Sequence, residues 1–238
     1  NMFPHHEDEI AQSEAANGCR FVNMWMHCAH LMVENQKMSK SLGNFYTLKD
    51  ILDKGYSGRE IRYVLIGTYY RQSLNFSFQA REEARGNLQR IDAFRERLQD
   101  VAMHGAEGDA TPEQAAAFEK AGAAFLAALQ DDLNVSAGLG VLFDFLRESN
   151  RELDAGAFTA AAARGALEAL GKMDEVLAVM EPDASELKVP EEIQKMADER
   201  QAARAAKDWA KADLLRKAID EAGWIVKDTP KGPQLLRK

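Results

Sequence analysis

Residues 37–44, Lys-Met-Ser-Lys-Ser-Leu-Gly-Asn, combine two amines and two hydroxyls in a segment that ends in a glycine turn. Lys37 and Lys40 are three residues apart, and Ser39 and Ser41 flank Lys40. Ammonium groups and rotatable hydroxyls can surround a polyphosphate, so charge that develops on a phosphoryl group meets donors already in place. A Lys-x-x-Lys pair alone is more often a solvated basic turn, but the eight positions together favour a phosphate-binding loop. We call residues 37–44 the lysine loop.

His5 and Glu9 form a candidate pair of metal ligands. They are four residues apart at a predicted helix start, so their side chains share one face, about 5 to 6 Å apart at Cβ. Imidazole nitrogen and carboxylate oxygen both bind zinc, but a four-coordinate site needs two more ligands, commonly thiolates. A surface hydrogen bond between the two side chains is the alternative. Cys19 and Cys28 lie nine residues apart without a Cys-x-x-Cys pairing, which indicates reduced thiols.

Two other groups have a structural explanation that is at least as good as a chemical one. Trp25 and His27 precede the lysine loop and could line a nucleotide or amino-acid pocket, but core packing explains them equally well, so neither is given a catalytic role. Asp131-Asp132-Leu133-Asn134 could be taken for metal ligands. Because it precedes a predicted helix, N-capping by Asn134 is the better explanation.

The elements that must position these residues are mostly helices. Pro4 and the acidic residues after it predict a helix over 5–16. Residues 31–33 could form a short strand leading into the lysine loop, and 47–52 a short helix. A capping box at Ser57-Gly58-Arg59-Glu60 begins a helix that is predicted to run to about Tyr70.

The middle of the chain predicts an antiparallel helical bundle. Apolar residues at three- and four-residue steps mark one helix over 79–101, and N-terminal signals at Pro112, Asn134 and Thr159 begin three more. Their connections are short, as in a bundle. Prolines near 182 and 190 then indicate a boundary. Beyond it we expect helices near 190–206 and 208–222, a strand at 224–229 and a turn into 234–236.

Composition and charge limit the function classes. The 238 residues are 46% hydrophobic and 29% charged, which is ordinary for a globular protein. Without an apolar run of about 20 residues or a signal peptide, we expect a cytoplasmic protein with no membrane partner. The net charge is −8, yet residues 200–238 carry +5. This basic end could meet phosphates, along a stripe of Arg200, Arg204, Lys207, Lys211 and Arg216.

Three segments together resemble the cysteinyl-tRNA synthetases, a family of class I aminoacyl-tRNA synthetases. They are Phe-Pro-His-His-Glu-Asp-Glu-Ile-Ala-Gln-Ser at 3–13, Trp25-Met26-His27 and the lysine loop, in the order and spacing of that family. The resemblance continues along nearly the whole chain, through Tyr70-Arg71, Leu74-Asn75-Phe76-Ser77, Asp131-Asp132-Leu133-Asn134, Lys207-x-Trp209-x-x-Ala212-Asp213-x-x-Arg216 and Asp228-Thr229-x-x-Gly232.

The resemblance implies a ligase that activates cysteine with ATP and transfers it to tRNA(Cys). His5 and Glu9 fall on the family's zinc ligands, and Lys40 falls on the residue that contacts ATP, with Lys37 assisting it. Ser39 and Ser41 are then also part of the nucleotide site. The implied cofactors are Zn²⁺ and ATP, with Mg²⁺ accompanying ATP, and the implied partners are cysteine and tRNA(Cys).

The expected fold is mainly α. It comprises a remnant of a Rossmann-like class I catalytic domain at 1–47, a connecting helical stem at 48–78, a DALR-like helical bundle at 79–182, and a small anticodon-binding module with a β-hairpin at 189–238.

The chain has no initiator methionine, and the family's His-x-Gly-His motif and two cysteine zinc ligands are absent from it. We therefore expect a C-terminal half, inactive alone and holding zinc weakly or not at all, because neither Cys19 nor Cys28 matches the missing ligands. Two alternatives stay open. One is the cysteine–amino sugar ligase of mycothiol synthesis, which has no use for an anticodon-binding module, and the other is a non-catalytic helical tRNA-binding fragment.

Overall fold

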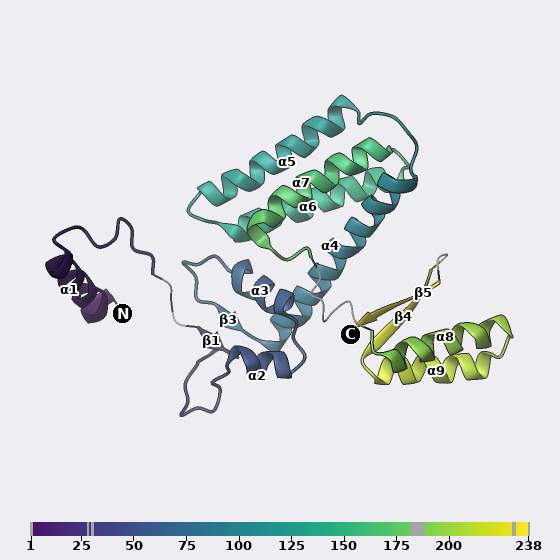
Figure 1. The fold of residues 1–238 in the computed structure, drawn as a ribbon, viewed down its shortest axis with the longest axis horizontal. Coiled ribbons are helices and arrows are strands. Elements are labelled where there is room, and N and C mark those ends of the chain that lie inside the picture. Colours follow the sequence, from purple (N-terminus) through teal and green to yellow (C-terminus); the bar gives the residue numbers. More distant parts are fainter. Residues whose placement is uncertain (1, 28, 30, 182–188, 230–231, 238) are drawn as a thin grey trace. The chain divides into compact units, whose positions relative to one another are not determined.

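The computed structural model describes residues 2–27, 29, 31–181, 189–229 and 232–237 (Figure 1). The chain divides into two compact units, unit 1 at residues 1–180 and unit 2 at residues 181–238. Both are built mainly from helices, with one small sheet in each. The mainly α fold class predicted from the sequence is confirmed.

Unit 1 begins with an irregular π-helical turn, Met2–His6, followed by α1, Glu7–Asn17. Three acidic residues occupy the first turn of α1, where the helix dipole favours negative charge. Gly18, with φ +65°, ends the helix because it adopts the left-handed conformation at no steric cost. None of the side chains of α1 is buried.

A three-stranded sheet follows, with the strand order β2-β1-β3. Its strands are β1 (Met32–Val33), β2 (Gln36–Lys37) and β3 (Asn75–Phe76). β1 pairs antiparallel with β2 and parallel with β3, so a segment about 40 residues further along the chain lies beside the start of the lysine loop. The short strand predicted near residues 31–33 is confirmed, whereas β3 has no counterpart in the sequence-based expectations.

Two short helices lie between β2 and β3 in the chain, α2 (Leu48–Asp53) and α3 (Gly58–Gly67). Capping boxes begin both, at Thr47 and at Ser57. The expectation that α3 runs to Tyr70 was wrong. Gly67 is a poor helix former, and Thr68 already has an extended backbone, φ −93° and ψ 130°.

Four longer helices form the bundle shown in the upper part of Figure 1. They are α4 (Phe78–His104), α5 (Pro112–Gln130), α6 (Val135–Asp154) and α7 (Ala160–Leu177). The predicted helix starts are confirmed, because the side chains of Thr111, Asn134 and Thr159 each accept a hydrogen bond from the first turn of their helix. α3 packs against α4 and α6, which joins the sheet region to the bundle.

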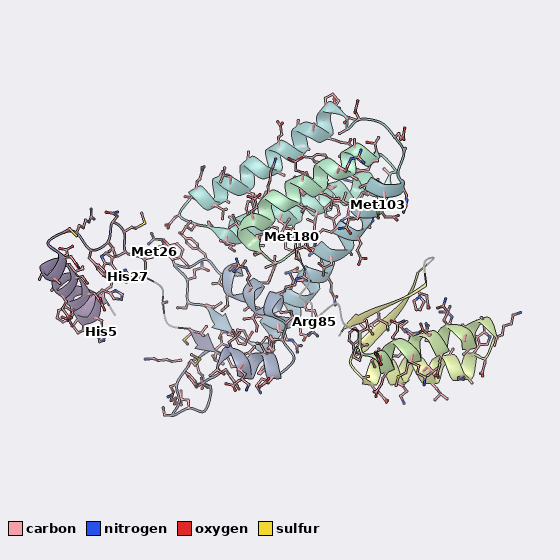
Figure 2. The ribbon with its side chains drawn as sticks, in the orientation of Figure 1. His5, Met26, His27, Arg85, Met103 and Met180 are labelled. Carbon is pink, nitrogen blue, oxygen red and sulfur yellow. The ribbon has the colours of Figure 1, made fainter. Side chains whose placement is uncertain are left out.

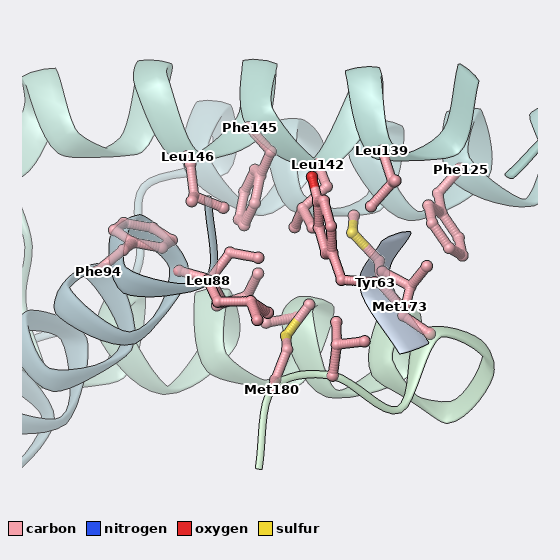
Figure 3. Close-up of a cluster of buried hydrophobic side chains, with 14 of the residues drawn as sticks. Tyr63, Leu88, Phe94, Phe125, Leu139, Leu142, Phe145, Leu146, Met173 and Met180 are labelled. Carbon is pink, nitrogen blue, oxygen red and sulfur yellow. The ribbon is translucent and has the colours of Figure 1, made fainter. Parts of the chain in front are cut away.

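Aliphatic and aromatic side chains fill the space between these helices (Figure 3). Ile91 and Leu98 of α4, Leu142 of α6 and Leu177 of α7 are completely inaccessible to solvent. Phe145 meets two other rings edge to face, at centroid distances of 6.1 and 5.9 Å. Aromatic pairs favour this geometry. The core therefore has a defined packing that includes residues of both α3 and α4.

Unit 2 is a helical pair with a hairpin, composed of α8 (Glu191–Ala205), α9 (Trp209–Glu221), β4 (Trp224–Thr229) and β5 (Gly232–Arg237). The strands are antiparallel, with Trp224 opposite Arg237 and Thr229 opposite Gly232. Gly223, with φ +83°, allows the sharp passage from α9 into β4. The two helices and the two strands agree with the expectation from the sequence, β5 is longer than predicted, and the predicted turn at residues 230–231 lies outside the described residues.

Arg200 and Arg204 both bind the carboxylate of Asp228 on β4. The guanidinium of Arg200 donates at 2.8 and 3.1 Å, and Arg204 adds a third hydrogen bond. These contacts, that of Arg200 foremost, hold the pKa of the Asp228 carboxyl well below its usual range. Sequence reasoning included Arg200 in a basic stripe that could meet phosphates, but its side chain is buried in this pair.

The pair should make unit 2 sensitive to acid. Because folding lowers the pKa of Asp228, its contribution to stability is complete above the unfolded value of about 4 and is lost as the pH falls toward the folded value. Trp224 is the buried tryptophan of unit 2, so its fluorescence reports this unfolding. We expect the melting temperature of unit 2 to fall as the pH is lowered from about 5 to about 3. The fall should be smaller in Asp228→Asn. Glu221→Gln, which removes a surface ion pair with Lys217, is the control. Equal acid sensitivity in Asp228→Asn would contradict the assignment.

Within the described part of the chain, every helix is either too short or too polar to cross a lipid bilayer.

Candidate functional site: the lysine loop and the opening helix

The lysine loop begins in a tight hairpin. β1 and β2 are joined by Glu34 and Asn35, which both adopt left-handed backbone angles, φ +48° and +61°. Such two-residue turns match the twist of the strands that they join, and asparagine tolerates this conformation well. The hairpin ends on Lys37, so its geometry sets where the loop starts.

Two side-chain contacts fix this hairpin to β3 and α4. Asn75 accepts from the backbone N–H of Asn35 at 2.8 Å, and its amide donates to the side-chain oxygen of Asn35 at 3.0 Å. The carboxylate of Glu34 accepts from the N–H of Phe78 at 2.9 Å, at the positive end of the α4 dipole. The start of the lysine loop is thus attached to the helix that forms one side of the bundle.

Asn44 closes the loop from within. Its side chain accepts from the N–H of Ser39 at 2.9 Å and donates to the carbonyl of Lys37 at 3.2 Å, so it joins both ends of the segment. The hydroxyl of Ser39 accepts from the N–H of Leu42 at 3.3 Å, and Gly43 takes a left-handed turn with φ +68°. Sequence reasoning assigned Asn44 no role, although the asparagine is the last residue of the eight-residue motif.

The loop presents its charged side chains to solvent. Lys37 and Lys40 are exposed, and among the described residues neither forms an ion pair. The ammonium of Lys40 lies 5.6 Å from the ring centroid of Phe45, within cation–π range. Ser41 is exposed, with its hydroxyl 3.2 Å from that of the half-buried Ser39. A closed backbone that displays two amines and a hydroxyl can bind an anion without first becoming ordered.

The predicted metal ligands precede the three-stranded sheet in the chain. His5 is in the turn before α1 and Glu9 is in the first turn of α1, and both are exposed. Their donor types suit zinc. Among the described residues, however, no group of three or more His, Cys, Asp or Glu side chains could hold a metal. Cys19 is exposed, and Cys28 lies outside the described residues.

A stacked ring cluster beside α1 was missed by sequence reasoning. The Nδ1 atom of His6 lies 2.8 Å from Nε2 of His27, and the His6 ring stacks on Trp25 at 5.2 Å. Figure 2 shows His5 in the turn before α1 and His27 in the adjacent segment. Of the two explanations left open for Trp25, core packing does not hold, since the side chain is 37% exposed. Sequence reasoning singled out Trp25 and His27, but no local periodicity relates them to His6, so their stacking on it was not predicted.

Comparison with known protein families covers most of the chain. Residues 1–86 match the class I tRNA synthetase (C) catalytic domain, residues 124–181 match the DALR domain, and residues 188–235 match the cysteinyl-tRNA ligase anticodon binding domain. The first match includes His5, Glu9 and the whole lysine loop.

Curated relatives match the chain along its whole length. A cysteine–tRNA ligase of Protochlamydia amoebophila is 42% identical over 238 residues, which is all of this chain and 49% of the relative. Those of Chlamydia pneumoniae and Chlamydia abortus are 43% and 41% identical over 99% and 100% of the chain, and 49% of each relative is covered. The chain thus spans about half the length of the relatives it matches. Because three domains match in succession and cysteine–tRNA ligases align along the whole of this chain, the chain belongs to the cysteinyl-tRNA synthetase family.

Proposed function

We propose that this chain is part of a ligase that activates cysteine with ATP and transfers it to tRNA(Cys). The chain contributes the lysine loop, two zinc ligands and the anticodon-binding module. The observation that carries the proposal is the closed lysine loop, which displays Lys37 and Lys40 on a backbone held by Asn44. The family matches on either side of the bundle support it.

Lys40 acts on the phosphates of ATP. When a carboxylate oxygen of cysteine attacks the α-phosphorus, a new P–O bond forms and the bond to pyrophosphate breaks. Negative charge then grows on the phosphate oxygens, and the ammonium of Lys40 stabilises it, with Lys37 assisting. Ser41 supplies a hydroxyl to the same anion, while Ser39 is used mainly inside the loop, through Leu42 and Asn44. Mg²⁺ accompanies ATP.

His5 and Glu9 would hold zinc together with ligands from outside the described residues. Bound zinc would select cysteine, because a soft sulfur ligand suits it better than the hydroxyl of serine. The exposure of both side chains fits a role that is completed by other parts of the active site.

The basic side chains of unit 2 are proposed to meet tRNA. Lys207, Lys211 and Arg216 are exposed, whereas Arg200 is engaged with Asp228. Phosphate contacts of this kind position a nucleic acid without specifying its bases. The anticodon-binding match of residues 188–235 favours the synthetase over the amino-sugar ligase, which acts on no RNA.

Two assays on the product of the complete gene test the proposal. We expect ATP–pyrophosphate exchange that depends on cysteine and is at least about a hundredfold slower with serine, as differential zinc affinity requires. We also expect charging of tRNA(Cys). Cysteine-dependent exchange without charging, but with cysteine joined to an amino sugar, would identify the alternative ligase. Absence of exchange from folded protein would leave only a non-catalytic tRNA-binding role.

A further inference from the structure

Three side chains of one short segment converge on a single carboxylate in the bundle. The hydroxyls of Tyr69 and Tyr70 donate to Asp132 at 2.5 and 2.6 Å. Arg71 donates from Nε and, at 3.3 Å, from Nη2. The guanidinium of Arg71 also lies over the Tyr70 ring, 5.3 Å from its centroid. The polar side-chain ends of residues 69–71 are therefore directed at one carboxylate on the turn between α5 and α6.

The backbone of that turn is unusual. Asp132 and Leu133 both have left-handed angles, φ +57° and +56°, although neither is glycine. Non-glycine residues keep such angles where the surrounding structure determines them, and such positions cluster at functional sites. The turn itself is fixed by backbone bonds from Leu133 to Leu129 and from Asn134 to Ala128. It presents the Asp132 carboxylate from a rigid position.

The segment that Asp132 contacts is connected to the lysine loop through β3 and β1. Residues 69–71 precede β3, which pairs in parallel with β1 through Met32 opposite Asn75 and Val33 opposite Phe76. β1 in turn pairs with β2, which ends on Lys37. One continuous series of contacts thus runs from the bundle turn through β3 to the start of the loop.

We propose that Asp132 is a positioning residue for the lysine loop, acting through residues 69–71 and β3. The cluster is exposed, with 62% of the Arg71 side chain and 41% of the Asp132 side chain accessible. Surface ion pairs contribute little to stability. The benefit of four donated hydrogen bonds on one carboxylate is therefore placement of the attached segment. In support, these contacts, that of Arg71 foremost, hold the pKa of the Asp132 carboxyl well below its usual range, so it stays ionised.

The catalytic consequence rests on the proposed function, but the structural one does not. In Asp132→Ala we expect amide hydrogen exchange at residues 31–44 and 72–76 to become at least about fivefold faster, with little change in melting temperature. We expect the rate of pyrophosphate exchange to fall about tenfold, a magnitude typical of coupling through intervening residues. The KM for ATP should rise and that for cysteine should stay unchanged. Asp132→Asn keeps an acceptor oxygen and should recover part of both effects.

Asp131→Ala is the matched control, because it removes the same charge from the adjacent exposed position of the same turn. It should leave hydrogen exchange and kinetics near wild type. Unchanged hydrogen exchange in Asp132→Ala, or equal effects in the two alanine variants, would overturn the proposal. If the wild type has no pyrophosphate exchange at all, the proposed function is wrong, and hydrogen exchange still decides the positioning role.

Discussion

Lys40→Ala should lower the rate of cysteine-dependent pyrophosphate exchange at least about a hundredfold in the product of the complete gene. A well-placed donor to developing oxyanion charge stabilises the transition state by about 3 to 4 kcal/mol, and the exposed ammonium of Lys40 stands on a loop already closed by Asn44. The interaction is strongest in the transition state, so the rate should fall far more than the affinity for cysteine. Initial rates over a range of ATP and cysteine concentrations separate the two.

Lys49→Ala supplies the control for that measurement. Lys49 is an exposed lysine of α2, a few residues beyond the loop, and its loss changes the net charge by the same amount. Its exchange rate should stay within about twofold of wild type, since a surface substitution away from the site perturbs little. An unchanged rate in Lys40→Ala would refute the assignment. An equal loss in both variants would trace the effect to general electrostatics.

Local signals predicted most of the helices correctly, because each signal acts within one turn. Thr111, Asn134 and Thr159 accept hydrogen bonds from the N–H groups that a helix start leaves unpaired, and a side chain can reach those groups whatever the remaining fold is. The predicted end of α3 was wrong because contacts between distant residues act there. Tyr69 and Tyr70 continue an apolar pattern, but their hydroxyls bind Asp132, more than sixty residues away.

In the candidate site, too, local features could be predicted from the sequence and long-range contacts could not. The type and spacing of its residues marked the lysine loop, and the roles of Lys37, Lys40, His5 and Glu9 stay predictions. The sequence could not reveal which contacts hold the loop in place. The hairpin turn depends on Asn75, forty residues away, and no periodicity connects two asparagines across that distance. The pairing of β3 with β1 likewise joins residues that are far apart in the sequence, which no local pattern reveals.

Loss of the buried Glu60 side chain should destabilise unit 1 strongly. It is 6% exposed, and one carboxylate oxygen accepts from the N–H of Ser57 at 3.0 Å in the α3 capping box. The other accepts from Nε of Arg85 at 2.6 Å, and Nε of Arg81 lies 3.5 Å from the oxygen that caps the helix. Arg81 also donates to the carbonyl of Gly55 at 2.7 Å. A single buried anion therefore caps α3 and neutralises two largely buried cations of α4.

Glu60→Ala should lower the free energy of unfolding of unit 1 by about 3 to 5 kcal/mol, because removing one partner of a buried ion pair leaves the other charge uncompensated. Glu60→Gln keeps the capping acceptor and should lie between the alanine variant and wild type. Urea denaturation followed by circular dichroism measures the change, and hydrogen exchange of α3 and α4 peptides assigns it to unit 1.

Glu82→Ala is a closely matched comparison, since Glu82 lies within 4.0 Å of the same two arginines, yet its side chain is 64% exposed. Its loss should cost at most about 1 kcal/mol, as for other surface pairs. Similar losses in Glu60→Ala and Glu82→Ala would mean that solvent screens both carboxylates equally. In that case burial of Glu60 would not account for how α3 is held on α4.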